Sequence, residues 1–135
     1  MVGSLLMARR PELMPVGPNM PGSFLLPSPN AYRSIFRHKD GTYDWETELN
    51  YGWNLIDSAS CGSLAAVIVE CIQSSAGIHV LPPGYLKAMK VHCEKRGMLL
   101  IVDEAQTGIG RYNNLSITFL DITDRGDKMR RSLCN

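Results

Sequence analysis

The sequence lacks the features of a membrane protein or of a nucleic-acid-binding protein. No apolar run approaches the roughly 20 residues that a membrane helix needs. Charge of neither sign is in excess, since 14 Lys and Arg residues stand against 13 Asp and Glu residues, for a net charge of +1. Such a balance gives no electrostatic reason to expect nucleic acid or an anionic membrane as partner. Within residues 1–10 the arginines follow the apolar stretch, which is the reverse of a secretory signal. We therefore expect neither kind of partner.

Closely spaced cysteines and metal-binding histidines are also missing. The four cysteines stand at positions 61, 71, 93 and 134 and form no CxxC pair. The three histidines, at positions 38, 79 and 92, share no metal-ligand spacing. These spacings fit neither a zinc site nor a disulfide framework. We expect reduced, structural thiols, an intracellular (cytoplasmic) location and no metal.

Length and proline distribution divide the chain into three parts. Its 135 residues fit one domain, and 44% of them are hydrophobic, as in an ordinary globular protein. Six of the eight prolines lie within residues 1–31, where they favour irregular, extended backbone. We expect an irregular Pro-rich segment over 1–43, an α/β unit over 44–111 and a separate tail over 112–135.

The α/β unit is predicted to begin with a helix. Asp44 is a suitable N-cap, and the spacing of Leu49, Trp53 and Ile56 gives one apolar face over residues 45–58. The continuous apolar run 65–69 is typical of a buried strand, and 74–84 is expected to be a loop.

A second helix and strand are predicted to complete a βαβ unit. Pro83 suits the first helical position, while Tyr85, Met89 and either His92 or Cys93 form an apolar stripe. Gly97 is expected to end this helix, which spans about 84–96, and 98–102 is the second buried strand. A strand, a crossover helix and a strand give a right-handed unit with parallel strands, and the fold class is α/β.

The most informative motif follows that second strand. The nine residues from Asp103 to Arg111 place a carboxylate, then a turn with Gly108 and Gly110, at a strand end. Ligands of open α/β sheets bind outside the carboxyl ends of the strands, so Asp103 is a candidate cofactor ligand. For Asp103 the alternative is a loop residue that merely caps the following turn. For Gln106, which lies three residues later in the same motif, the alternative to a role in ligand binding is an ordinary surface residue.

The motif and a collinear series before it resemble the class III aminotransferases, and among them 2,2-dialkylglycine decarboxylase. The series comprises Gly22-Ser23-Phe24, Tyr32-Arg33, Gly41-Thr42-Tyr43-Asp44, Leu64 to Glu70, Ser74 to Ile78, Leu81 to Tyr85 and Cys93 to Leu100. The resemblance covers residues 17–111. The sequence departs from the family pattern at Cys71, where Pro is usual, and at Tyr112-Asn113, where Thr-Gly is usual.

The resemblance implies part of the large domain of a fold type I enzyme that uses pyridoxal 5′-phosphate (PLP). It implies that Asp103 holds the ring nitrogen, that Gln106 contacts the ring hydroxyl oxygen, and that Ser75 lies near the substrate. Glu70 would support the site through its neighbours without touching the cofactor. The alternatives are that Glu70 is a solvated residue at a strand end and that Ser75 only forms a turn. Amino-acid and keto-acid substrates and a homo-oligomer are implied as well.

The lysine that forms the Schiff base in this family has no match. Only Lys128 follows Asp103, and it lies in a polar run with no apolar strand before it. The family's phosphate-binding turn, ring-stacking aromatic residue and substrate-carboxylate Arg also have no counterpart. We therefore expect a truncated, catalytically inactive fragment with no catalytic residue and doubtful PLP binding.

Residues 112–135 match nothing in the family, so a disordered or artefactual tail is expected. A non-catalytic interaction module and a fragment of an ordinary ω-amino-acid aminotransferase are the competing hypotheses.

Overall fold

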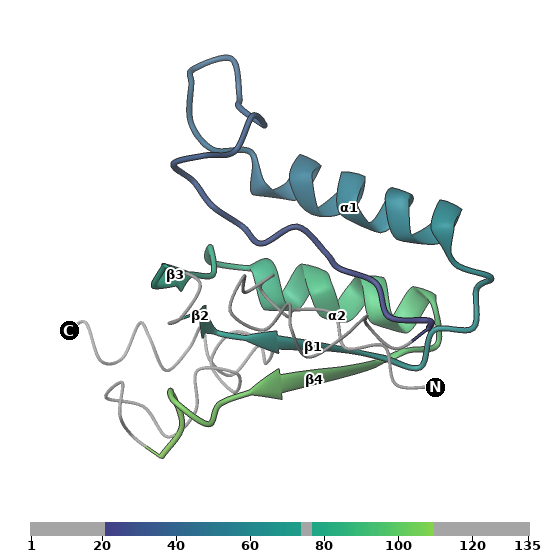
Figure 1. Cartoon of the computed structure of the whole chain (residues 1–135). Helices are drawn as coiled ribbons and strands as arrows, with labels where there is room; N and C mark the ends of the chain where they lie inside the picture. Colours follow the sequence, from purple (N-terminus) through teal and green to yellow (C-terminus); the bar gives the residue numbers. More distant parts are fainter. Residues whose placement is uncertain (1–20, 74–76, 110–135) are drawn as a thin grey trace, which may run out of the picture.

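The computed structural model describes residues 21–73 and 77–109, which form a βαβ unit preceded by a helix (Figure 1). The elements are α1 (Trp45–Ala59), β1 (Ala66–Glu70), β2 (Ile72–Gln73), β3 (His79–Val80), α2 (Tyr85–Lys95) and β4 (Leu99–Asp103). Strands β1 and β4 are parallel, with a register that runs from Ala66 opposite Leu99 to Glu70 opposite Asp103. The predicted parallel βαβ unit is therefore confirmed.

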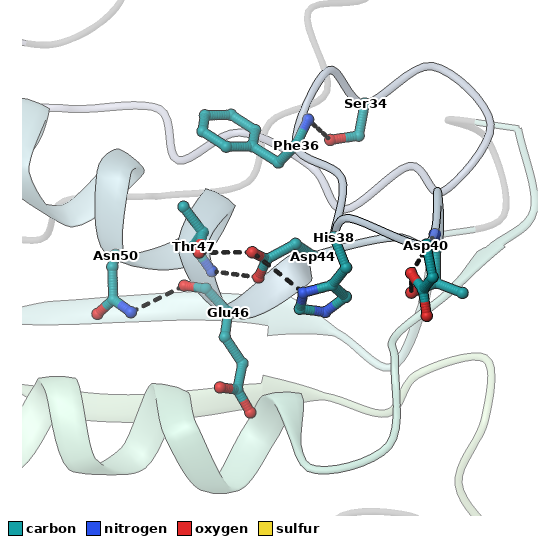
Figure 2. A network of polar contacts seen from close by, with 9 residues as sticks. Ser34, Phe36, His38, Asp40, Asp44, Glu46, Thr47 and Asn50 are labelled. Carbon is teal, nitrogen blue, oxygen red and sulfur yellow. Dashed lines mark hydrogen bonds and ion pairs between the residues drawn. The ribbon is translucent and has the colours of Figure 1, made fainter.

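The first helix begins where its N-cap predicts. The side chain of Asp44 accepts a hydrogen bond of 3.0 Å from the backbone N–H of Thr47 and a second of 2.7 Å from its hydroxyl (Figure 2). Because these bonds favour the carboxylate, they hold the pKa of Asp44 below its usual 3.8, the backbone bond contributing most. Satisfying a free N–H group in the first turn stabilises the start of α1.

Both helices lie on one side of the β1–β4 pair (Figure 1). Val67 and Val69 of β1, together with Leu100 and Val102 of β4, contribute to the apolar clusters that the helices complete. Side chains alternate between the two faces of a strand. The intervening residues, including Leu99 and Ile101, therefore face away from the helices.

The expectation that β4 is buried on both faces is wrong. Leu99 is 69% exposed and Ile101 is 42% exposed, whereas Val67 and Val69 of β1 are fully buried. An apolar run records only that a strand can be buried, and the second face of β4 is not covered by the described helices.

Three local predictions also need correction. Both strands lie one residue later than the predicted 65–69 and 98–102, so Glu70 and Asp103 are their last residues. The predicted loop contains β3, which pairs antiparallel with β2. Pro83 is not the first helical residue, because Gly84, at a φ of +84°, is the N-cap of α2.

The N-terminal segment reaches the core through one apolar residue. Leu26 is buried in the same cluster as Trp53 of α1. A methyl group added to Gly52 of α1 would lie 2.9 Å from Cδ of Pro27 and 3.0 Å from Cδ1 of Leu26. The glycine thus permits the close approach of the segment to the helix.

A polar clamp joins the two helices on their outer side. The guanidinium of Arg96 donates hydrogen bonds of 2.8 Å and 2.6 Å to the two carboxylate oxygens of Asp57. Its Cζ lies 4.4 Å from the centroid of the Trp53 ring, and the ring of His92 stacks on the same indole at 5.6 Å. The clamp therefore combines a bidentate ion pair with a cation–π contact.

Neither α1 nor α2 is long and apolar enough to cross a lipid bilayer, and no other helix occurs in the described ranges.

Candidate active site

Two carboxylates meet at the carboxyl ends of the parallel strands. Glu70 of β1 is the register partner of Asp103 of β4, and both side chains are half-buried. The alternation of side chains puts both carboxylates on the face that the helices leave open. Parallel strands lie about 4.8 Å apart, so the site concentrates negative charge beside an apolar surface.

The turn after β4 is held by its own backbone. Oδ1 of Asp103 accepts a hydrogen bond of 2.9 Å from the N–H of Ala105, and the N–H of Gly108 donates one of 2.8 Å to the carbonyl of Glu104. A Cβ atom at position 108 would lie 2.8 Å from that carbonyl oxygen, so the turn requires glycine here. The turn fixes the orientation of the Asp103 carboxylate.

Two side chains of this turn make no hydrogen bond to the described residues, and one of the two is buried. Gln106 is exposed and forms no hydrogen bond to the residues that the structure describes. Thr107 is only 5% exposed, and its Oγ1 has no hydrogen-bond partner in the part of the chain that the structure describes. An unpaired buried hydroxyl costs free energy, so Thr107 is a point where the turn can gain a contact.

A second polar group lies on β2 and β3, which follow β1. The hydroxyl of Ser28 donates a short hydrogen bond to Oε1 of Gln73, which is 5% exposed and whose Nε2 has no partner among the described residues. Nδ2 of Asn30 lies 3.3 Å from Nε2 of His79. No local sequence pattern singles out Gln73 or Thr107.

The structure thus brings together two of the four predicted site residues. Asp103 and Glu70 are register partners, and Gln106 follows in the turn that Asp103 begins. Ser75 lies outside the described residues, as do Gly110, Arg111, Lys128 and Cys134.

In the described ranges no group of three or more His, Cys, Asp or Glu side chains could hold a metal ion. The other three cysteines form no disulfide within the described ranges.

The donors and acceptors of the site fit the ring of PLP. Oδ1 of Asp103 is engaged by Ala105, while its other oxygen makes no hydrogen bond to the described residues and can accept one from a protonated ring nitrogen. The neighbouring Glu70 adds negative charge that favours the cationic form of such a ring. The exposed amide of Gln106 can donate to an oxygen atom on the ring.

Comparison with known proteins gives the family of the chain. A family model described as "Aminotransferase class-III" matches residues 13–115. An uncharacterized aminotransferase of Schizosaccharomyces pombe is 57% identical over 99 residues, which are 73% of this chain and 22% of the relative. An acetylornithine aminotransferase of Methanopyrus kandleri is 45% identical over 58 residues, which are 43% of this chain and 15% of that protein.

A solved structure gives the same result. A thermostable (S)-enantioselective omega-transaminase from Thermomicrobium roseum shares 32% identity and a TM-score of 0.58 with this chain, over 73% of this chain and 22% of that one. The chain therefore spans about a fifth of the length of the S. pombe aminotransferase and of this omega-transaminase. The α/β fold is that of part of the PLP-binding domain of fold type I enzymes, and the chain belongs to the class III aminotransferase family.

Proposed function

We propose that this chain carries the part of a class III aminotransferase that holds the PLP ring, and that residues 1–135 alone do not catalyse transamination. The position of Asp103 at the carboxyl end of β4, with its carboxylate oriented by Ala105, carries the proposal. PLP, when bound, supplies an electron sink for the carbanion that forms at the α-carbon of an amino acid.

The chain's own residues have three proposed roles. Asp103 accepts a hydrogen bond from the ring nitrogen and keeps that nitrogen protonated. Glu70 increases the negative potential at the same place, because the two strand ends are adjacent. Gln106 donates to the ring hydroxyl oxygen, and Ser75 contacts the substrate. No described lysine is proposed as a catalytic residue.

For the reaction subtype we propose decarboxylation coupled to transamination, as in 2,2-dialkylglycine decarboxylase. The support is the collinear series of residues from Gly17 to Arg111. An ordinary aminotransferase reaction is the second candidate, because the relatives reported above are named aminotransferases or transaminases. The substrates proposed for either reaction are an amino acid and a keto acid.

We also propose an intracellular location and a homo-oligomeric parent enzyme. The buried Cys93 forms no disulfide within the described residues, which suits a reducing compartment. Family membership supports the homo-oligomer.

A segment exchange tests the role of Asp103. Residues 13–115 would replace the matching segment of the S. pombe aminotransferase, and the chimera would be assayed for PLP absorbance and transamination. Asp103→Asn removes the charge at the ring nitrogen, so we expect transamination to fall by about 100-fold or more. A chimera that binds PLP and is indifferent to Asp103→Asn would contradict the proposal. Release of CO₂ from a 2,2-dialkylglycine would separate the two reaction subtypes.

The isolated chain tests the other half of the proposal. We expect no transamination and no specific covalent adduct with PLP, because affinity and the covalent step both need groups beyond Asp103 and Gln106. Exposed lysines form weak adducts with any aldehyde, so Lys128→Ala is the control. A single stoichiometric adduct on Lys128, trapped by borohydride and lost in this variant, would show that the tail is part of an active site.

A further inference from the structure

Two side-chain contacts link the segment before α1 to the strand pair β2–β3. The hydroxyl of Ser28 donates a hydrogen bond to Oε1 of Gln73, and Nδ2 of Asn30 lies 3.3 Å from Nε2 of His79. Gln73 of β2 and His79 of β3 are register partners, so the two contacts hold both strands at the same point of the pair. These four residues form a polar brace between parts of the chain that lie 45 and 49 positions apart.

The turn that follows Asn30 fixes the direction of one of these bonds. Oδ1 of Asn30 accepts hydrogen bonds of 3.1 Å from the backbone N–H groups of Tyr32 and Arg33. The amide nitrogen therefore faces His79 as a donor, and Nε2 of His79 accepts as the unprotonated ring nitrogen. The brace thus needs a donor on Asn30 and not merely a polar group.

The segment that carries Ser28 is itself held in place. Proline restricts its own backbone and that of the residue before it, and Pro27 and Pro29 stand on either side of Ser28. Leu26 is buried in the cluster of α1, and Pro27 lies close to Gly52 of that helix. The brace therefore ties β2 and β3 to the position of α1.

The backbone just before His79 is strained. Ile78 has a φ of +56°, a value that β-branched residues rarely adopt. Gly77 has a φ of +119°, and a Cβ atom there would lie 2.8 Å from Nε2 of His79. Strained backbone persists only where its surroundings hold it, and such strain gathers at functional sites. The bond from Asn30 to His79 holds the residue that directly follows Ile78.

We propose that Ser28 and Asn30 are positioning residues for substrate binding. Gln73 and His79, which they hold, are the ends of the connection that carries Ser75 in the sequence. This connection follows β1 at the end where Glu70 meets Asp103, and thus lies beside the proposed cofactor site. The inference rests on the proposed contact of Ser75 with the substrate. Ser28 and Asn30 act through that connection and do not themselves touch the substrate.

Amide hydrogen exchange of the full 135-residue chain tests whether the brace holds the strand pair. The N–H of Leu81 donates a bond of 3.1 Å to the carbonyl of Cys71 and so reports on this pair. Ser28→Ala should accelerate its exchange by about fivefold or more, whereas Ser28→Thr, which keeps a hydroxyl, should not. The N–H of Leu99, bonded to the carbonyl of Ala65, is the internal control and should not change. An unchanged Leu81 amide, or equal acceleration of both amides, would overturn the brace.

Steady-state kinetics of the chimera described above test the positioning role. We expect Ser28→Ala and Asn30→Ser each to raise KM for the amino acid by about fivefold, with kcat and PLP absorbance unchanged. Serine at position 30 keeps a turn-forming oxygen but is too short to reach His79. Ser58→Ala is the matched control, because this exposed hydroxyl of α1 donates to the carbonyl of Asn54 and should leave KM unchanged. Loss of PLP absorbance in both brace variants would mean general damage and would also overturn the proposal.

A double-mutant cycle separates this inference from the proposed function. If Ser28 acts through Ser75, Ser28→Ala should add less than about twofold to the KM of Ser75→Ala. An unchanged KM in Ser75→Ala alone would remove the proposed substrate contact, and this inference with it. A raised KM in Ser75→Ala, with no effect of Ser28→Ala or with fully additive effects, would overturn this inference and leave the proposed function standing.

Discussion

At the scale of single residues, the carboxylates of Glu70 and Asp103 are the feature with the clearest energetic cost. The two strand ends are register partners, so like charges lie side by side on one face. Like charges directly opposite one another in a sheet are destabilising, and opposite or neutral pairs are not. Folding of this chain therefore tolerates a local penalty at the place where a cation is proposed to bind.

Removing one charge should stabilise the fold. We expect Glu70→Gln to raise the free energy of unfolding by about 0.5 kcal/mol in low salt, since cross-strand pairs are worth roughly 0.2–1 kcal/mol. Urea denaturation followed by circular dichroism measures the change. Glu94→Gln is the matched control, because Glu94 forms only an exposed helix pair with Lys90 at 3.9 Å. A gain no larger than the control's would mean that the two carboxylates do not interact.

Single-residue predictions from the sequence succeed where the cause is local. Asp44 as an N-cap and Gly97 as the residue after the C-cap of α2, with a φ of +64°, depend only on the neighbouring backbone. The buried amide of Gln73 depends on a hydrogen bond to Ser28, 45 positions away, and no local pattern indicates it.

At the scale of the elements, the clamp of α2 on α1 depends on pH. Burial of the His92 ring, reinforced by the positive charges of Arg96 and Lys95, lowers the pKa of His92 below its usual 6.5, and Asp57 opposes this weakly. Hydrogen bonds from Arg96 lower the pKa of Asp57 below 3.8. Both folded pKa values are lowered, so in both cases the unfolded chain binds protons first as the pH falls.

We therefore expect stability to fall in two windows. The contribution of His92 to the free energy of unfolding is complete above pH 6.5. It declines as the pH falls below that value toward the pKa of His92 in the folded chain. The contribution of Asp57 persists to about pH 3.8 and is lost as the pH falls through its own folded pKa. In urea titrations His92→Gln should abolish the loss of stability between pH 7.5 and 5.5 and should leave the loss below pH 3.8, measured at about pH 3, in place. An unchanged loss between pH 7.5 and 5.5 in that variant would refute the role of His92.

Contact between α1 and the N-terminal segment depends on Gly52. Alanine is the better helix former by roughly 1 kcal/mol, but its methyl group would lie 2.9 Å from Pro27. Overpacking of this kind costs about 1–3 kcal/mol, so we expect Gly52→Ala to be destabilising despite the gain in helix propensity. Thermal unfolding measures the net change. Asn54→Ala, on the exposed face of α1, shows the propensity effect alone, and an equal response of both variants would exclude the clash.

The elements themselves follow from periodicity, and their surroundings do not. The spacing of Leu49, Trp53 and Ile56 predicts the buried face of α1, and the apolar runs predict two parallel strands. The same runs do not reveal that β4 has one described neighbour, because an apolar strand has the same sequence pattern in the centre and at the edge of a sheet. The two-residue strands β2 and β3 are too short to produce a recognisable alternation.

At the scale of the whole molecule, one apolar cluster joins nearly every described element. It contains Leu26 of the N-terminal segment, Trp53 of α1, Val67 of β1, Met89 of α2 and Met98, just before β4. Met89 is fully buried at the centre of this arrangement. The cluster is small because the described helices cover only one face of the strand pair, so little other apolar burial is available to replace it.

Met89→Ala should consequently unfold most of the molecule. Truncation of a buried Met costs about 2–5 kcal/mol, and whole domains are stable by only about 5–15 kcal/mol. Since each helix and both long strands contact this cluster, we expect loss of the amide dispersion in an NMR spectrum throughout the described residues, not only in α2. Val91→Ala, at a site 44% exposed on the same helix, is the control and should keep the spectrum of the unsubstituted chain. If Met89→Ala disturbed α2 alone, the helix would be packed independently of α1 and the sheet, and the single-cluster description would fail.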